Sequence, residues 1–511
     1  IKATGGPTLR MYLRGRIEST GEFAAGVAAF DNTGDVTINV LQTASITGGW
    51  QADTASKGAM NATHAAGLLV ESPAASAIVN AGRIGAASDR AIANYRYGTA
   101  TGGAIVVDNS GTITGFVAFS GAAGNRFTNA ADGLLDLRHL ADTNGDGARD
   151  TKRVAISDFG ANDSVFDNAG TVRLADVAGA PVVDAAGYYL PTTGSDRRAL
   201  DPAFYDLARN GVTQAQMVNL GVFSHAGVID LRGDAIGNTL VITGNSVANG
   251  TPGGGVFVSE GGKLYLSAVL NEGLAAGGTV NSHADMLIVD STRLGSAATT
   301  IFVSYDPDDL GGLTDGNGIQ LVEVLDKTAS DADVFVLGNM VAAGAYEYAL
   351  HHNGVGDDAA DGNWYLRSAR VTTPTPPGPP PADPDDDDGD DDDQSPPPPP
   401  VTQPEPPAPE YPVYRREIAT YVTVPALAHR FSLDMLGSFH DRAGGASDGR
   451  QAWGRLFGFD GSVGSTRGDL ARQYGRFARR GASYDHKSYG LQAGLDLYRD
   501  GGAAAGFYAG A

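Results

Sequence analysis

The sequence contains no cysteine among its 511 residues. This absence excludes disulfide bonds, cysteine-ligated zinc, iron–sulfur clusters and a cysteine nucleophile. A chain without cross-links also suits passage through a membrane pore in an extended state. Length alone allows roughly three domains of about 150 residues each, which is enough to bury substantial cores.

Basic residues and long apolar runs are also scarce. Lys and Arg number 36 against 59 Asp and Glu, which gives a formal net charge of −23. This balance excludes nucleic-acid binding that depends on phosphate contacts. No run of 18 apolar residues occurs, so the sequence predicts no transmembrane helix, although the alternating strands of a membrane barrel would escape such a search. The 71 glycines, about twice the usual share, favour a turn-rich β protein.

Residues 371–412 differ sharply from the rest of the chain. They hold 17 of the 25 prolines, no Lys or Arg, and nine aspartates between Asp383 and Asp393. Pro-rich sequence favours extended polyproline II, and clustered like charges stretch the chain further. Such a segment buries too little apolar surface to offset its ordering entropy. We therefore predict a disordered Pro/Asp-rich linker that acts as a spacer; a ligand for a proline-recognition module is the alternative.

A short pattern, Asn-x-Gly followed by an apolar residue, recurs upstream of this linker. The copies are Asn80-Ala-Gly82, Asn109-Ser-Gly111 and Asn168-Ala-Gly170, with looser forms at Asn32-Thr-Gly34 and His225-Ala-Gly227. Each copy is typical of a turn that leads into a strand. The Asn109, Asn168 and His225 copies lie 59 and 57 residues apart, which we interpret as three units of about 20 in each gap.

Units of this size are too small to bury a core alone and must stack. The repeats therefore predict an all-β fold, a right-handed parallel β-helix, with a β-sandwich of repeated hairpins as the alternative. Residues 180–221 interrupt the pattern with three prolines and a polar stretch. We interpret them as a loop insertion.

The C-terminal part of the chain shows strand signals on both sides of one helical stretch. Residues 263–368 contain six apolar strand segments separated by Gly-rich turns. Residues 414–436 change to helical spacing, with Pro425 inside the stretch. Residues 489–498 alternate strictly, with Tyr489 and Leu491 on the apolar face and Gln492 on the other. This alternation is typical of a transmembrane barrel strand, although a soluble antiparallel strand alternates in the same way.

Three stretches together resemble the type V secretion autotransporters, in particular the pertactin-like branch. The stretches are 262–368, similar to the end of a β-helical passenger; 414–442, similar to the helix before the translocator barrel; and 453–458 with 489–496, similar to its first strands. The resemblance implies a β-helix passenger (1–262), a C-terminal autochaperone-like section (263–370), the linker (371–412) and a partial barrel domain with an N-terminal helix (413–511). The 99 residues after Pro412 suffice for only about three or four strands, so we expect a fragment truncated at both ends, with a truncated transmembrane β-barrel.

A metal site is predicted at Asp142-Thr-Asn144-Gly-Asp146-Gly147-Ala-Arg-Asp150. Asp142, Asn144, Asp146 and Asp150 place oxygen donors at positions 1, 3, 5 and 9 of a calcium loop, with glycine at position 6. Arg153 stands at position 12, where the bidentate acid belongs. Calcium is the only cofactor that the sequence suggests, and a solvated polar loop is the alternative.

An interaction site is suggested by Arg232-Gly233-Asp234, an RGD tripeptide of the kind that integrins bind. A second copy at 467–469 shows how easily the match arises in a Gly-rich chain. A charged β-turn is the alternative interpretation.

The predicted function is that of an outer-membrane autotransporter whose barrel exports and anchors a surface-displayed passenger. Adhesion or another host-surface interaction is expected, through loops such as 121–165 and 180–221. The implied partners are the outer membrane, its barrel-assembly machinery and host-cell or matrix receptors, with a monomeric chain and no nucleic acid. No catalytic residue is predicted, because the G-x-S-x-G match at 445–449 follows a helix instead of a strand.

Two other functions remain open: an enzyme passenger, either protease or esterase, whose catalytic part lies elsewhere, and a self-association protein. If the passenger is released, the exposed spacer 371–412 is the expected target of the protease.

Overall fold

The computed structural model describes residues 1–4, 8–30, 33–52, 65–94, 102–119, 121–149, 151–152, 154–174, 214–233, 236–248, 250–271, 284–306, 308, 310–371, 410–415, 417–436, 450–463, 484–500 and 503–511. They form two units, one of Ile1–Gly344 with Tyr348–Arg367 and one of Ala345–Glu347 with Ser368–Ala511. The prediction of disorder for the Pro/Asp-rich segment falls on 372–409, outside the described residues. The boundary predicted at 262/263 stays a prediction.

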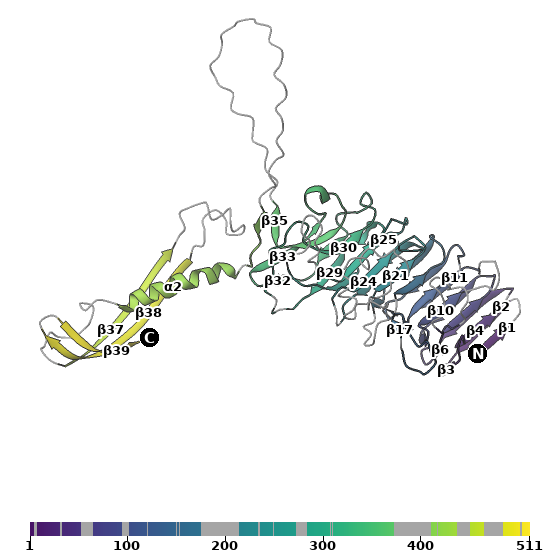
Figure 1. The fold of residues 1–511 in the computed structure, drawn as a ribbon, viewed down its shortest axis with the longest axis horizontal. Helices are drawn as coiled ribbons and strands as arrows, with labels where there is room; N and C mark the ends of the chain where they lie inside the picture. The colour runs from purple at the N-terminus through teal and green to yellow at the C-terminus, as the bar shows by residue number, and fades with distance from the viewer. Residues whose placement is uncertain are drawn as a thin grey trace, which may run out of the picture. The chain divides into compact units, whose positions relative to one another are not determined.

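The first unit is a parallel β-helix with three long sheets (Figure 1). Sheet A contains β1 (Lys2–Thr4), β4 (Val27–Phe30), β7 (Leu68–Glu71), β10 (Arg90–Asn94), β13 (Phe116–Ala118), β18 (Ala155–Asp158), β21 (Gln214–Val218), β24 (Thr239–Ile242), β27 (Met286–Val289), β30 (Ile319–Val324), β34 (Trp364–Arg367), β33 (Tyr346–His352) and β32 (Val341–Ala343). Sheet B contains β2 (Thr8–Leu13), β5 (Asp35–Val40), β8 (Ser76–Asn80), β11 (Ile105–Asn109), β14 (Arg126–Asn129), β19 (Ser164–Asn168), β22 (Leu220–His225), β25 (Val256–Glu260) and β28 (Thr292–Ala297). Sheet C contains β3 (Arg16–Glu18), β6 (Ser45–Gly48), β9 (Arg83–Ala86), β12 (Thr112–Thr114), β15 (Leu134–Leu137), β20 (Thr171–Leu174), β23 (Val228–Asp230), β26 (Lys263–Ser267), β29 (Thr299–Ser304) and β31 (Phe335–Leu337).

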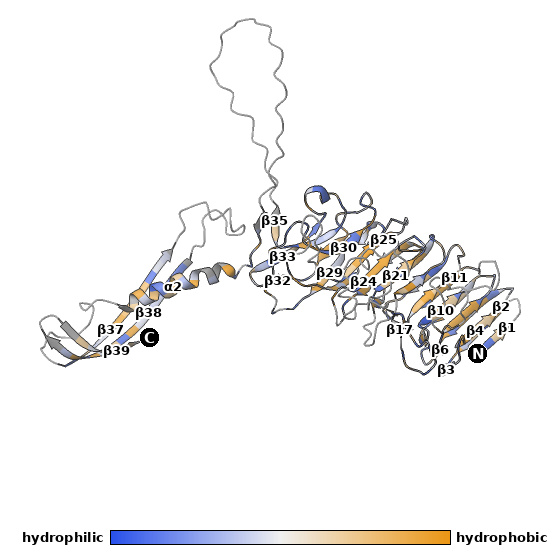
Figure 2. Ribbon diagram, in the orientation of Figure 1, coloured by the Kyte–Doolittle hydropathy of each residue, from blue (hydrophilic) through white to orange (hydrophobic). Residues whose placement is uncertain are grey.

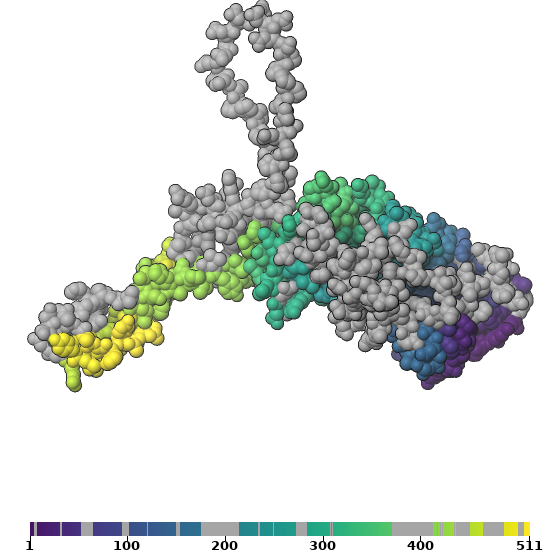
Figure 3. Space-filling model, in the orientation of Figure 1, coloured from purple at the N-terminus to yellow at the C-terminus, as the bar shows by residue number. Residues whose placement is uncertain are grey.

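The chain visits the sheets in the order A, B, C and then returns to A one rung further along. From β1 to β31 the paired strands of the three sheets run parallel from one rung to the next, as Ile105–Asn109 does with both neighbours. At the C-terminal end of sheet A, β34 pairs antiparallel with β30 and with β33. The all-β parallel β-helix predicted from the repeats is therefore confirmed, and the β-sandwich alternative is wrong. In Figure 3 the colour of this unit changes from purple through blue and teal to green along its length, which follows the order of the chain.

The core of the β-helix is apolar and stacked, as the orange strands of Figure 2 indicate. Phe127, Phe166, Phe223 and Phe257 occupy one inward column of sheet B, and neighbouring ring centroids lie 4.8, 5.0 and 5.7 Å apart. Each ring is fully buried. Stacking of these aromatic side chains thus stabilises the packing of adjacent rungs in the middle of the β-helix.

A ladder of buried amides occupies the turn between sheets B and C. Asn80 donates to the Oδ1 of Asn109 at 2.7 Å, Asn109 to Asn129 at 2.9 Å, and Asn129 to Asn168 at 2.9 Å. Each Nδ2 also donates to a backbone carbonyl of the next rung, such as Thr171 O for Asn129. The side chains therefore satisfy their own buried polar groups by stacking, which explains the recurring Asn-x-Gly pattern.

The ladder corrects the predicted count of units. One rung separates Asn80 from Asn109, and Asn129 marks a rung between Asn109 and Asn168 that the pattern missed. A single rung joins Asn168 to His225 across 57 residues. The two gaps therefore hold two rungs and one rung instead of three each, because the additional residues belong to insertions at another corner.

His225 ends this ladder in place of an asparagine. Its Nδ1 accepts from Asn168 Nδ2 at 3.2 Å, and its Nε2 donates to Lys263 O at 3.2 Å. This arrangement requires a neutral imidazole, and burial lowers the pKa of His225 to about 4. Between pH 6.5 and pH 4 the His225 side chain is protonated in the unfolded chain but stays neutral in the folded chain. The free energy of unfolding therefore decreases as the pH falls towards 4.

We therefore expect His225→Asn to continue the ladder and to reduce acid sensitivity. The wild type should lose roughly 3 kcal/mol more of its free energy of unfolding than the variant between pH 7.5 and pH 4. Urea titrations of the passenger at both pH values measure this difference. Equal losses in the two proteins would show that the histidine does not control acid stability.

The second unit contains β35 (Ala369–Val371), β36 (Glu410–Pro412), α2 (Ile418–Leu436), β37 (Gln451–Val463), β38 (Tyr484–Asp500) and β39 (Ala503–Gly510). The predicted helix 414–436 begins four residues later than expected, and β37, β38 and β39 form an antiparallel sheet. Val371 and Glu410–Pro412 are paired, so the predicted linker 371–412 is too long at both ends. No helix in the described ranges has both the length and the apolar character needed to cross a membrane.

The strands β37 and β38 carry different residues on their two faces. Tyr489, Leu491 and Leu495 are exposed, whereas Gln492 and Asp496 are buried on the opposite face. α2 lies against this second face, where the Gln492 side chain donates to Met435 O and the Phe431 and Phe457 rings lie 6.4 Å apart. The alternation predicted for 489–498 is therefore present as far as Leu497, with the apolar face exposed. A register shift between Asp496 and Tyr498 leaves Tyr498 exposed as well.

Candidate functional site

The corners of the β-helix differ greatly in the length of chain they contain. The B-to-C corner is short, as at 81–82, 110–111, 169–170 and 226–227, because the amide ladder fixes its geometry. The C-to-A corner contains the long segments 49–67, 138–154, 175–213, 268–285 and 305–318. Because equivalent strands stack in register, all these segments leave the fold along one edge of the rungs. We name this edge the C–A corner.

The sequence suggested two loops for function. The first, 121–165, is not a single loop, because β14, β15 and β18 lie within it, and only its residues 138–154 belong to this corner. Residues 180–221 were predicted as one insertion, but β21 begins at Gln214 and β22 at Leu220. The chain leaves sheet C at Leu174 and enters sheet A at Gln214, so the insertion begins and ends at the C–A corner. Residues 175–213 themselves lie outside the described residues.

Residues 138–154 extend from the C–A corner and fold back over earlier rungs. Within them β16 (Leu140–Ala141) and β17 (Thr151–Lys152) pair as an antiparallel hairpin. The preceding corner consists of Gly115 alone, and the one before it of 87–89, which leaves room for this excursion. The amide of Asp142 donates to Ala87 O at 2.9 Å, which fixes the hairpin on the shorter corner.

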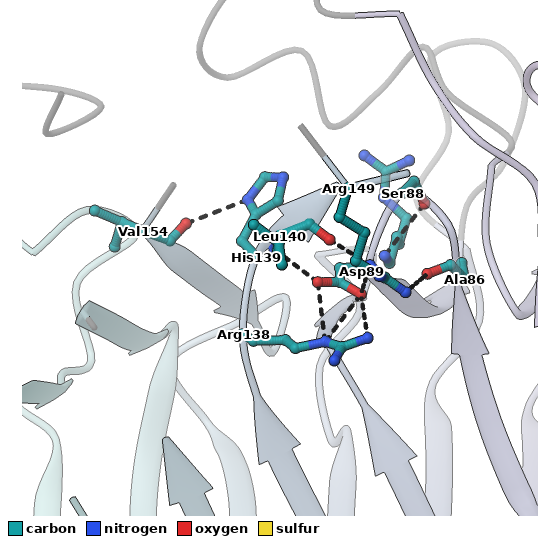
Figure 4. A network of polar contacts seen from close by, with 9 residues as sticks. Ala86, Ser88, Asp89, Arg138, His139, Leu140, Arg149 and Val154 are labelled. Carbon is teal, nitrogen blue, oxygen red and sulfur yellow. Dashed lines mark hydrogen bonds and ion pairs between the residues drawn. The ribbon is translucent and has the colours of Figure 1, made fainter. Parts of the chain in front are cut away.

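Asp89 attaches the hairpin to the scaffold (Figure 4). Its carboxylate accepts from Arg138 Nε at 3.1 Å, from Arg149 Nη1 at 2.6 Å and from the amide of Leu140 at 2.7 Å. The Asp89 side chain is fully buried, whereas those of Arg138 and Arg149 retain 23% and 29% exposure. One carboxylate thus binds both ends of the excursion, together with Ala86 O, which accepts from Arg149.

The surroundings of Asp89 carry an excess of positive charge. Burial raises the pKa of Asp89, and Arg149 and Arg138 oppose that shift. Buried Arg90 lies nearby, with its guanidinium 5.6 Å from the Phe116 ring centroid. Burial lowers the pKa of His139 to about 4, so His139 is neutral above that pH while its Nδ1 contacts Val154 O at 3.3 Å. The network therefore holds the hairpin in place through one buried carboxylate and two partly exposed guanidinium groups.

The predicted calcium loop is the tip of this hairpin. The Asp142 carboxylate accepts the amides of Asn144 at 3.1 Å, Gly145 at 2.6 Å and Gly147 at 3.0 Å. Asn144 and Asp146 accept further amides within the loop. In the described part of the chain no three His, Cys, Asp or Glu side chains gather as a metal site. Asp150 lies outside the described residues, and calcium binding stays a prediction.

Gly145 has a packing role that the calcium motif does not require. Its φ of +81° lies in the left-handed region, and a Cβ there would come within 2.6 Å of the Trp50 indole. Trp50 follows β6, so the tip of the hairpin contacts a corner several rungs towards the N-terminus. The glycine therefore permits both the turn and the close approach to the scaffold.

The predicted RGD site also lies at the C–A corner, directly after β23. Arg232 donates to both Asp230 carboxylate oxygens at 2.8 Å, and its guanidinium lies 4.5 Å from the Tyr265 ring centroid. The Tyr265 and Phe302 rings stack at 5.0 Å on the next rung. The Arg232 side chain is thus engaged within the surface, Asp234 lies outside the described residues, and integrin binding stays a prediction.

Comparisons with known proteins find a family model and relatives that are similar to parts of this chain. A family model described as Autochaperone Domain Type 1 matches residues 254–350. The chain is 28% identical over 179 residues to the uncharacterized protein YuaQ of Escherichia coli (strain K12), which covers 35% of this chain and 11% of YuaQ. It is 29% identical over 160 residues to the adhesin BmaC autotransporter of Brucella suis biovar 1 (strain 1330), covering 30% of this chain and 4% of BmaC. The chain thus corresponds to a small part of both relatives.

Proposed function

We propose, on the premise that this chain carries the passenger of a type V secretion autotransporter, that the passenger is an adhesin displayed on the bacterial surface. The observation that carries the proposal is the concentration of long insertions at the C–A corner. A rigid stack that presents variable loops along one edge is a common way to build a binding surface. A relative whose name describes it as an adhesin supports the same class of function.

The organisation of the C-terminal rungs supports a role in export. Asp290 accepts Thr243 Oγ1 at 2.8 Å, the Gly244 amide at 2.7 Å and the Gly255 amide at 2.9 Å. Asp285, at the other end of β27, accepts the amides of Gly237 and Asn238 at 2.9 Å. Two carboxylates within residues 254–350 thus accept hydrogen bonds from backbone amides of the preceding rung. On this proposal, residues 254–350 fold first and template the upstream rungs, which build up in sequence.

The second unit supports anchoring in the outer membrane. β38 exposes Tyr489, Leu491 and Leu495 on one face, and its other face carries Gln492 and Asp496 against α2. Apolar residues towards lipid and polar residues towards the interior are what a transmembrane strand requires. We propose that these strands belong to the translocator barrel and that α2 occupies its interior.

Adhesion is tested by displaying the whole protein on a non-adherent laboratory bacterium. Attachment to epithelial cells and matrix proteins is compared with that of a strain displaying only the anchoring part. We expect passenger-dependent attachment that falls to the background level when 139–153 and 175–213 are both replaced by short Gly-Ser turns. Shaving with protease verifies that each variant reaches the surface.

The matched control changes a surface away from this corner. Val79 and Val106 are exposed on the outer face of sheet B, so Val79→Ser with Val106→Ser should leave attachment unchanged. Attachment that persists without the two insertions would contradict a binding surface at the C–A corner. No attachment by a displayed wild type would contradict adhesion itself.

A further inference from the structure

The two ends of the Pro/Asp-rich segment are paired with each other. β35 and β36 run antiparallel, with Ala369 opposite Pro412, Arg370 opposite Tyr411 and Val371 opposite Glu410. The chain therefore leaves this small sheet at Val371 and returns to it at Glu410. The segment 372–409 begins and ends at the same place, so it does not set the distance between the elements that flank it. The prediction that it acts as a spacer is wrong.

The returning strand is hydrogen-bonded on both sides. The amide of Val413 donates to Ser368 O at 2.6 Å, and its carbonyl accepts the amide of Glu347 at 2.9 Å. The amide of Arg415 donates to Ala345 O at 3.1 Å. Residues 410–415 thus lie as a central strand between 368–371 and 345–347, and both neighbours precede the Pro/Asp-rich segment in the chain.

Side chains reinforce this position. The Tyr414 ring stacks on that of Tyr346, with centroids 5.7 Å apart and planes inclined by 23°. The same two residues form an antiparallel bridge. Val413 is buried, with 9% of its surface exposed. Main-chain pairing provides affinity and the side chains fix the register, which is how an added strand is held in other sheets.

We infer that residues 410–415 are an internal docking strand for the C-terminal end of the passenger, which stays bound to it after the chain is cut between 372 and 409. Every contact of the docking strand named above is made with residues on the N-terminal side of such a cut. After proteolysis of the Pro/Asp-rich segment, the passenger would no longer be covalently linked to the C-terminal part of the chain. It would stay attached through the non-covalent contacts of the docking strand. The inference goes beyond adhesion and does not depend on what the passenger binds.

The test uses the whole protein, purified in detergent, with a recognition sequence for a specific protease in place of 386–392. After complete cleavage, the two fragments are separated by size-exclusion chromatography. We expect them to co-elute in native buffer and to separate in denaturant. In Val413→Pro, which lacks the amide that donates to Ser368, co-elution should be lost. The matched control Val413→Thr keeps the amide and the β-branched side chain and should behave like the wild type.

A milder pair of variants keeps the test decisive if the proline variant does not fold. Tyr414→Ala removes the stack on Tyr346 and should shorten the lifetime of the cleaved complex, whereas Tyr414→Phe should preserve it. Separation of the wild-type fragments in native buffer overturns the inference. Co-elution of the Val413→Pro fragments to the wild-type extent overturns it as well, because the docking strand would not then be the cause.

Discussion

Replacing Asp89 by asparagine should detach residues 138–154 from the rungs they cover. Asparagine keeps the shape of the side chain and tolerates the left-handed backbone of Asp89, whose φ is 58°. It removes the charge that Arg138 and Arg149 share, and breaking a buried ion pair by removing one partner costs about 3–5 kcal/mol. We expect the lower end, about 3 kcal/mol, because both arginines are partly exposed and water can solvate them.

The effect should be local, and hydrogen exchange measures it. Amides of the hairpin should lose protection by about two orders of magnitude, in line with the 3 kcal/mol, while those of the B-to-C turns keep theirs. Glu18→Gln is the control, because Glu18 and its partner Arg16 form an ion pair in sheet C in which both side chains are exposed, by 39% and 77%. That variant should change protection by less than about 1 kcal/mol. Unchanged exchange of the hairpin in Asp89→Asn would show that the backbone contacts alone hold it.

The sequence predicted the β-helix because its amide ladder leaves a local signature. Asn80, Asn109 and Asn168 each precede a glycine by two residues, and this spacing produces the turn into sheet C. The Asn-x-Gly pattern did not identify Asn129, because the turn after it is longer and the glycine follows at position 133. The count of rungs failed for a related reason, since a period of about 20 residues cannot be measured across insertions at the C–A corner.

The candidate site itself was only partly predictable. The insertions appeared as interruptions of the pattern, but nothing in the sequence showed that 138–154 and 175–213 share one edge of the fold. Asp89 lies 49 residues from Arg138 and 60 from Arg149, so their interaction leaves no local motif. Gly145 was attributed to a calcium loop, whereas its contact with Trp50 depends on packing across rungs. The docking of 410–415 could not be predicted from the sequence. The composition of the Pro/Asp-rich segment indicates disorder, but it does not show that the residues on either side of the segment pair with each other.

Asn129→Ala should divide the passenger into two parts that unfold separately. The wild-type side chain accepts from Asn109 at 2.9 Å and donates to Asn168 at 2.9 Å and to Thr171 O at 3.0 Å. Alanine leaves these buried groups without partners, which costs roughly 2–4 kcal/mol in total. In a stack of rungs that contact only their neighbours, such a loss falls on one interface and weakens the coupling across it.

The direction of the effect distinguishes templating from independent folding. If residues 254–350 template the upstream rungs, those beyond Asn129 towards the C-terminus stay folded while the N-terminal rungs open first. Urea titration should then show a new early transition, and limited proteolysis should leave a resistant fragment that begins after Asn129. Thr128→Ala, on the outer face of the same strand, should retain the wild-type transition. A resistant fragment on the N-terminal side would contradict templating from the C-terminal rungs, because the stability of the stack would then lie at its other end.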